Sequence, residues 1–189
     1  MPLLLRLLLA AVSGAAVAIS FEPLGLVYLL PVGVAGLSLL VARVSPRRGF
    51  LLGAVFGSSF MLVLLPWLQV IGGDAWVALS LLEGVFYGLL GLGAVLVQRL
   101  PGWPVWTAML WVAVEALRSS FPFGGFPWGR LAFATADTPP AGLFAYVGSA
   151  GTTFAVALIG TALAWAVLEA RRTPALGAAA VVVPVLLAS

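Results

Sequence analysis

The sequence predicts an all-α integral membrane protein, a polytopic bundle of about seven transmembrane helices. Hydrophobic residues make up 63% of the 189 residues and charged residues only 8%, and the mean hydropathy is +1.19. Soluble domains are roughly 45–50% apolar, and a chain of this length could not hide so much apolar surface from water. Apolar runs of about 20 residues, the length that crosses a bilayer, recur along the chain.

The residue inventory excludes several kinds of site. The sequence has no Cys and no His, which removes thiol nucleophiles, imidazole bases, disulfides and the usual zinc ligands. We therefore expect no metal and no cofactor. The isoelectric point near 10.2 comes from a few arginines in loops, so it indicates membrane topology and not a nucleic-acid partner.

The spans are placed from the apolar runs and from the breaks between them. A tight hairpin at 21–23 separates the first two runs, and an arginine-rich segment at 43–49 separates the second from the third. Further breaks fall at 69–74 and 98–104, and the longest is the loop 120–148. The predicted spans lie near residues 2–20, 24–42, 49–68, 75–97, 105–119, 149–168 and 174–189.

The distribution of arginines predicts the orientation. Basic loops are retained in the cytoplasm, so we expect a cytoplasmic N-terminus, with the loop 120–148 and the C-terminus on the extracytoplasmic side. The predicted cytoplasmic face carries Arg6, Arg43, Arg47, Arg48, Arg99, Arg171 and Arg172, and the opposite face carries Arg118 and Arg130 with Glu22, Asp74 and Asp137.

The two ends of the chain need their own interpretation. Arg6 and the small residues at 16–18 partly fit a cleavable signal peptide. The apolar core is long and leads directly into a second run, which favours a retained helix. The sequence stops at Ser189 without a polar flank after the seventh predicted span. We expect a longer protein whose next part is extracytoplasmic.

The segment 121–130, Phe-Pro-Phe-Gly-Gly-Phe-Pro-Trp-Gly-Arg, differs from its surroundings. Pro and Gly at this density forbid a regular helix, and aromatic side chains favour the membrane–water boundary. An interfacial aromatic belt is one interpretation. A shaped loop that binds substrate or docks a further domain is the preferred one, with Phe126, Pro127 and Trp128 as its candidates.

Glu115 and Arg118 lie three positions apart, so they share one face near the end of the fifth predicted span. They could form a structural pair that holds the helix end to the loop. Alternatively they form a polar site beneath the loop, in which Arg118 or Arg130 binds the phosphate or ester of a lipid head group.

Glu83 is an acid inside the fourth predicted span, with Ser80 and Tyr87 at helical spacing. An intramembrane acid suggests a proton or cation site, although a carboxyl satisfied by a neighbouring helix is the simpler interpretation. Its role stays open. The pairs Gly53 with Gly57 and Gly84 with Gly88, each four residues apart, predict close helix packing.

Several segments carry a family resemblance. The runs 110–118, 125–129 and 131–133, with 64–68 and 21–25, resemble the apolipoprotein N-acyltransferase family, and the forms at 100–104 and 122–128 are similar to its actinobacterial members. The resemblance extends through essentially all 189 residues.

This resemblance implies a helical membrane part bearing an exported nitrilase-like domain, inserted before a final span. That domain supplies a Glu-Lys-Cys set, whose Cys takes an acyl chain from a phospholipid and passes it to the N-terminal amine of a diacylglyceryl-lipoprotein. This chain has no Cys and no Lys, so no catalytic residue maps onto it. The residues that map are Glu115, Arg118, Phe126, Pro127 and Trp128.

The resulting functional prediction is the membrane part of such an acyltransferase in the bacterial inner membrane, with phospholipid as donor and lipoprotein as acceptor. One alternative is a non-catalytic membrane scaffold or partner, for example of a polyprenol-phosphate mannose synthase. A small transporter that uses Glu83 is a third hypothesis.

Overall fold

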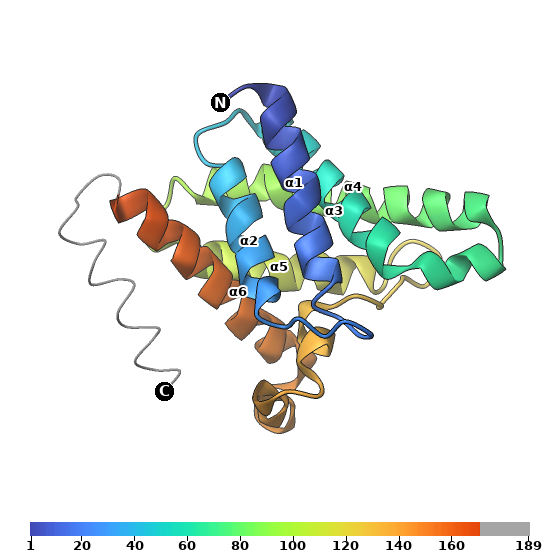
Figure 1. The fold of residues 1–189 in the computed structure, drawn as a ribbon. Coiled ribbons are helices and arrows are strands. Elements are labelled where there is room, and N and C mark those ends of the chain that lie inside the picture. The colour runs from blue at the N-terminus through green and yellow to red at the C-terminus, as the bar shows by residue number, and fades with distance from the viewer. Residues whose placement is uncertain (171–189) are drawn as a thin grey trace.

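The structure, a computed structural model, describes residues 1–170, and in this part of the chain every regular element is a helix (Figure 1). The all-α prediction is therefore confirmed for these residues. The α-helices are α1 (Leu3–Ala18), α2 (Leu29–Leu40), α3 (Pro46–Leu64), α4 (Gly73–Val97), α5 (Trp103–Arg118) and α6 (Phe144–Ala170), and the short 3-10 helices are η1 (Pro66–Val70), η2 (Leu131–Thr135) and η3 (Pro139–Leu143).

The principal helix contacts close a ring in the order α1, α3, α4, α5, α6, α2 and back to α1. Inside this ring lies an aromatic core made by Phe56, Phe60, Tyr87 and Trp111, all almost completely buried. Their ring centroids lie 5.6 to 6.0 Å apart, mostly in edge-to-face arrangements, which aromatic quadrupoles favour. The core thus joins α3, α4 and α5.

The pair α3 and α4 makes the most extensive contact and extends as a long hairpin (Figure 1). Glycines allow this approach, as the sequence predicted. A Cβ on Gly53 would lie 2.1 Å from the Tyr87 carbonyl oxygen, and one on Gly84 would lie 2.2 Å from the Ser58 hydroxyl oxygen. Gly57 and Gly88 likewise face side chains of the opposite helix. The prediction of small-residue packing is confirmed.

The prediction of about seven spans is wrong for the described part of the chain. By length and composition, three helical segments there can cross a membrane, Pro46–Leu64, Gly73–Val97 and Pro139–Ala170, and two shorter apolar helices accompany them. Residues 1–170 form six α-helices. The predicted seventh span, 174–189, lies outside the described residues.

The predicted span 24–42 shows why the count was wrong. Its helix, α2, has 12 residues and is therefore about 18 Å long, well below the roughly 30 Å of the hydrocarbon core. Residues 19–28 form turns instead, with Gly25 at a φ of +60° and the Leu26 N–H donating to the Ile19 carbonyl at 3.1 Å. Apolar composition alone did not reveal these turns. The hairpin expected at 21–23 is therefore longer than predicted.

The other boundaries agree better with the predicted spans. Pro66 follows the end of α3 and opens η1, because proline cannot continue a helix interior. The helix α6 contains a break at Gly148, whose φ is +63° and ψ −173°, so its regular part begins where the span 149–168 was predicted. The loop predicted at 120–148 contains η2, η3 and the first residues of α6.

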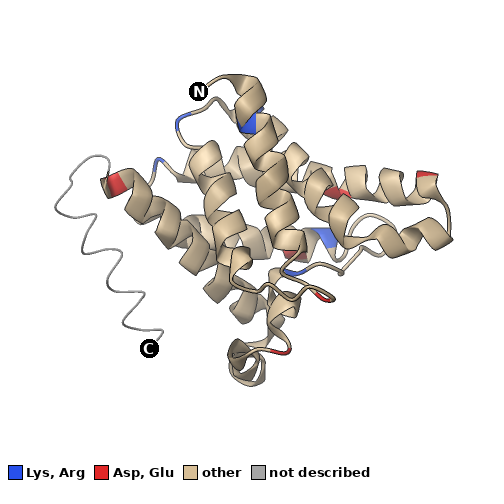
Figure 2. Cartoon of the chain, viewed as in Figure 1, with Lys and Arg blue, Asp and Glu red and all other residues tan. Residues whose placement is uncertain are grey.

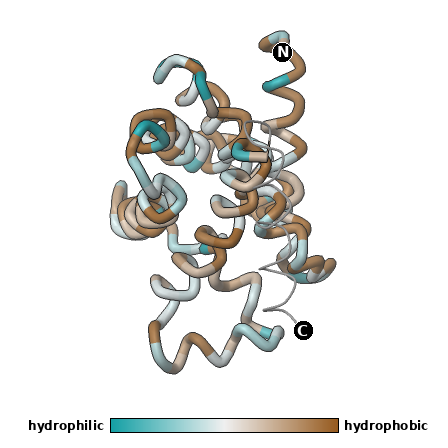
Figure 3. The backbone as a smooth tube through the Cα atoms, turned by 90° about the vertical axis from the view of Figure 1, so that its left-hand side faces the viewer, coloured by the Kyte–Doolittle hydropathy of each residue, from teal (hydrophilic) through white to brown (hydrophobic). Residues whose placement is uncertain are grey.

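The charged and the hydrophobic residues can be located on the fold. In Figure 2, basic segments lie on α1 near the N-terminus, on the connections that follow α2 and α4, and near the centre of the molecule. Acidic segments lie at the tip of the α3–α4 hairpin, in the lower loops, near the centre and at the end of α6. Hydrophobic residues run along most of α1 in Figure 3, interrupted by one hydrophilic stretch near the N-terminus.

Candidate functional site

The aromatic loop, residues 121–130, is shaped by backbone conformations that glycine permits. Gly125 has a φ of +82°, and a Cβ there would lie 2.1 Å from the Ser119 carbonyl carbon, so the loop returns to within contact distance of the end of α5. Gly129, at a φ of +72°, packs against Leu64 of α3. Only glycine combines this conformation with such close approach.

Arg118, the last residue of α5, holds the returning loop with its backbone and its side chain. Its carbonyl accepts a hydrogen bond from the Phe126 N–H at 2.7 Å. Its Nη1 donates to the carbonyl oxygens of Phe126, at 3.0 Å, and Trp128, at 2.8 Å. Arg118 is completely buried, so these are enclosed contacts, in which a charged donor binds strongly.

The same Nη1 also contacts Glu83 of α4, at 3.1 Å from Oε2, in an ion pair whose two side chains are 0% and 2% exposed. The guanidinium carbon lies 5.7 Å from the centroid of the Tyr87 ring, within the range of a cation–π contact. The acid that the sequence placed inside the fourth span is thus the ion-pair partner of Arg118.

Glu115, one turn earlier on α5, has its own set of hydrogen-bond donors. Its Oε1 accepts a hydrogen bond from the backbone N–H of Leu131 at 2.8 Å, and its Oε2 accepts one from the Thr153 hydroxyl at 2.8 Å. The side chain therefore joins α5 to η2 and α6. Glu115 and Arg118 were expected to pair with each other. Among the described residues, Arg118 instead forms its ion pair with Glu83.

Arg130 closes the loop on the side of α6. Its Nε donates to the Ser119 hydroxyl at 3.2 Å, and its Nη1 donates to the Ser149 hydroxyl at 3.1 Å. Arg130 is half-buried. Both partners are neutral hydroxyls, and no ion pair of Arg130 is found within residues 1–170.

The outer surface of the loop remains apolar and exposed. Phe121, Phe123 and Trp128 are 62%, 101% and 57% exposed, whereas Phe126 packs against the core. The Trp128 ring lies 5.9 Å from that of Trp67 in η1. Two tryptophans from distant segments therefore form one surface, flanked by the exposed Pro127.

Glu83, Glu115 and Arg118 form what we call the buried charge cluster. All three are at most 3% exposed. The Nε and Nη2 atoms of Arg118 and the Tyr87 hydroxyl are buried without a hydrogen-bond partner among the described residues. Because one guanidinium joins α4, α5 and two loop carbonyls, the cluster fixes the position of the loop, and the rings of Phe121, Phe123 and Trp128 stay exposed on its outer surface.

Within residues 1–170, no group of three His, Cys, Asp or Glu side chains could hold a metal ion. The residues that sequence reasoning missed are Thr153, Ser149 and Trp67, whose contacts join segments far apart in the chain. For Trp67 a signal existed, since segment 64–68 was one of those that carried the family resemblance.

Comparison with known proteins identifies the family. Residues 13–162 match the Apolipoprotein N-acyltransferase N-terminal domain. The chain is 41% identical over 153 residues to the apolipoprotein N-acyltransferase of Mycolicibacterium smegmatis, which covers 79% of this chain and 26% of the relative. It is 34% identical over 178 residues to the Chromobacterium violaceum protein of the same name, which covers 87% and 34%.

A third relative, the apolipoprotein N-acyltransferase of Shewanella oneidensis, is 29% identical over 176 residues, or 85% of this chain and 34% of the relative. The chain thus spans between a quarter and about a third of the length of these relatives. Its match lies in the N-terminal domain and includes the aromatic loop and the buried charge cluster. The chain therefore belongs to the apolipoprotein N-acyltransferase family, whose N-terminal domain it carries, and is a multi-pass protein of the bacterial inner membrane.

Proposed function

We propose that this chain is the membrane part of an enzyme that transfers an acyl chain from a phospholipid to the N-terminal amine of diacylglyceryl-lipoproteins. Its membership of the family supports this proposal, as do the acyltransferase names of its relatives. We assign no catalytic residue to the chain, because it contains no Cys and the family resemblance locates the reacting thiol in an extracytoplasmic nitrilase-like domain.

The orientation forms part of the proposal. Five of the seven arginines in residues 1–170 precede α5. Arg6 lies in α1, Arg43 follows α2, Arg47 and Arg48 lie in the first turn of α3, and Arg99 follows α4. The acids Glu22 and Asp137 lie in the connections after α1 and α5, and Asp74 lies in the first turn of α4. Because basic loops are retained in the cytoplasm, this pattern supports a cytoplasmic N-terminus and an extracytoplasmic aromatic loop, on the side where acyl transfer would occur.

The observation that carries the proposed role of the loop is the triple contact of Arg118 Nη1 with Glu83, Phe126 and Trp128. A loop held by a buried guanidinium is already ordered before it meets a ligand, which lowers the entropy cost of binding. We propose that its exposed rings hold the acyl chains of the substrates at membrane height. Positioning of this kind contributes much of the rate when the reacting groups are otherwise dilute.

A transport function has weaker support. A carboxyl on an ion pathway needs access to water or to the transported ion, whereas Glu83 is 1% exposed and paired with Arg118. The names of the relatives described above favour acyl transfer and do not favour a partnership with a mannose synthase.

The proposal can be tested with a chimera. The chain would replace the matching segment of the M. smegmatis relative, and N-acylation of a diacylglyceryl-lipoprotein would be measured by mass spectrometry in cells that lack their own acyltransferase. We expect the chimera to restore N-acylation. A correctly inserted chimera without activity would refute the assignment.

Within this chimera, Trp128→Ala should reduce acyl transfer about tenfold or more, because it removes one ring of the exposed Trp67–Trp128 pair. Trp106→Ala is the matched control, since Trp106 is an exposed tryptophan, 46% accessible, in the first turn of α5. Equal activity of the two variants would contradict a role of Trp128 in acyl transfer and would favour the interpretation of Trp128 as part of an interfacial aromatic belt.

A further inference from the structure

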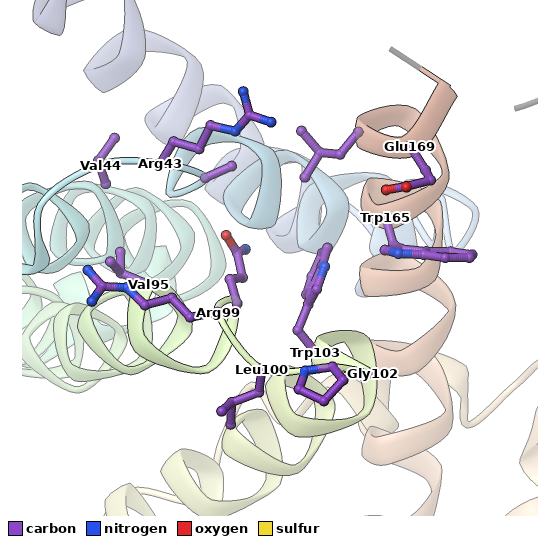
Figure 4. A pocket seen from close by; sticks show the side chains of 13 residues that line it. Arg43, Val44, Val95, Arg99, Leu100, Gly102, Trp103, Trp165 and Glu169 are labelled. Carbon is purple, nitrogen blue, oxygen red and sulfur yellow. The ribbon is translucent and has the colours of Figure 1, made fainter. Parts of the chain in front are cut away.

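A cavity of about 760 Å³ lies where the C-terminal ends of α2, α4 and α6 meet the beginning of α5 (Figure 4). This volume lies within the range of about 300–1,000 Å³ typical of ligand sites. The cavity is remote in sequence from the aromatic loop, and the proposed role of that loop does not use it. Gln98 lines the cavity and joins α2 to the end of α4, because its amide donates to the Ser38 carbonyl at 2.9 Å.

One wall of the cavity is apolar and aromatic. Trp103, Trp165 and Leu100 line it (Figure 4), together with Leu168 of α6. Trp103 is only 9% exposed, whereas Trp165 is 43% exposed. Tryptophan is enriched where a membrane meets water, and an apolar wall of this kind suits hydrocarbon better than a free polar metabolite.

Two arginines also line the cavity. Arg43 and Arg99 line the cavity (Figure 4), and both are exposed. The acid of this lining, Glu169, already makes an interaction of its own. No hydrogen bond or ion pair of the Arg43 or Arg99 side chain is found within residues 1–170, so no residue of this part of the chain uses their guanidinium donors.

A second cavity of about 240 Å³ adjoins the first through Arg43 and is lined by Arg6 and Arg48 as well. Arg6 is fixed there, because its Nη1 donates to the Leu40 carbonyl at the end of α2 at 2.7 Å. Arg43 itself has a φ of +58°, a conformation that costs energy for a non-glycine residue. The backbone thus places Arg43 between the two cavities.

We propose that the two cavities form a binding site for an anionic phospholipid, with its phosphate at Arg43 and an acyl chain along Trp103 and Trp165. Guanidinium donors match phosphate oxygens in a bidentate manner. Basic pockets between helices at the cytoplasmic side of membrane proteins bind anionic head groups, and this end of the molecule carries most of the arginines of residues 1–170. The site is separate from the donor-lipid role proposed for the aromatic loop.

The test is a lipid titration of the protein purified in detergent, followed by native mass spectrometry. Phosphatidylglycerol, phosphatidylcholine with the same acyl chains, and inorganic phosphate are the three probes. We expect phosphatidylglycerol to bind at least about fivefold more tightly than phosphatidylcholine, and inorganic phosphate to bind far more weakly than either. Equal binding of the two lipids would overturn the proposal, and so would binding of free phosphate with the affinity of phosphatidylglycerol.

Variants locate the site. Arg43→Gln and Arg99→Gln should each weaken phosphatidylglycerol binding about fivefold, because each arginine near a head group contributes on the order of a fivefold effect. Arg47→Gln is the matched control, since Arg47 is an exposed arginine in the first turn of α3, four residues after Arg43, and lines neither cavity. An equal loss in Arg47→Gln would show diffuse attraction instead of a site.

Arg43→Asn is a second variant that controls for misfolding of Arg43→Gln. Asparagine adopts the positive φ of this position more readily than glutamine does. It should show the same loss as Arg43→Gln. Retention of full phosphatidylglycerol binding in a folded Arg43→Asn variant would refute the assignment of the phosphate to Arg43.

Discussion

The buried charge cluster makes a prediction that a double-mutant cycle can measure. Its members Glu83 and Arg118 are 35 positions apart and joined at 3.1 Å. We compare Arg118→Gln, Glu83→Gln and the double variant. Glutamine removes the charge in both cases. It has the shape of glutamate but is shorter than arginine, so Arg118→Gln also removes contacts of the guanidinium, and the cycle is needed to isolate the coupling of the pair.

The magnitudes follow from the contacts of each side chain. Arg118→Gln leaves Glu83 buried without a counter-charge and removes the donor of the Phe126 and Trp128 carbonyls. Removing one partner of a buried ion pair costs about 3–5 kcal/mol. Glu83→Gln should cost less, about 1–3 kcal/mol, because Arg118 keeps both carbonyl acceptors.

The double variant should be more stable than the sum of the two single effects, by a coupling of about 1–3 kcal/mol, because no unpaired charge remains. Reversible unfolding in mixed detergent micelles, followed by tryptophan fluorescence, gives the free energies of unfolding. Arg47→Gln, an exposed change, should leave them unaltered. Strict additivity of the two single variants would show that the pair is not coupled and would refute the reasoning.

Two further predictions concern glycines. Gly53→Ala should destabilise the fold by about 1–3 kcal/mol, because its Cβ would meet the Tyr87 carbonyl. Gly73→Ala is the control and should be neutral, because the space around Gly73 is open. Equal melting temperatures of the two variants would contradict the close α3–α4 contact. Gly125→Ala should release the aromatic loop to protease far more than Gly124→Ala. Both positions have positive φ, but only Gly125 also faces backbone; equal cleavage rates would show that backbone strain alone decides the loop.

The sequence predicted the helical class and most helix positions because apolar runs and proline breaks act locally. Pro66 and Gly148 mark real breaks in the structure. The predicted span 24–42 was wrong because apolar composition indicates how well a segment partitions into lipid and does not indicate its backbone conformation. The turns of residues 19–28 depend on hydrogen bonds such as that between Leu26 and Ile19, which apolar side chains do not encode.

The sequence predicted which residues form the candidate site, but it did not predict which of them pair with each other. Spacing along one helix suggested that Glu115 pairs with Arg118, since residues three apart share a face. The structure connects Arg118 to α4 and Glu115 to η2 and α6. Which of several buried acids faces a guanidinium depends on the order of helices in the ring, and that order is a tertiary property.

The buried charge cluster also suggests why a membrane bundle would hold a loop by charge. Lipid is as apolar as leucine, so apolar contacts between a loop and a bundle are barely preferred over contacts with lipid and specify no register. A guanidinium that binds two loop carbonyls and a carboxyl is different, because lipid chains offer nothing to replace those bonds. The Phe126 and Trp128 carbonyls can both reach Arg118 Nη1 only in one arrangement of the loop. We therefore expect the pair to contribute specificity of loop position more than net stability, as the proposed role of the exposed rings requires.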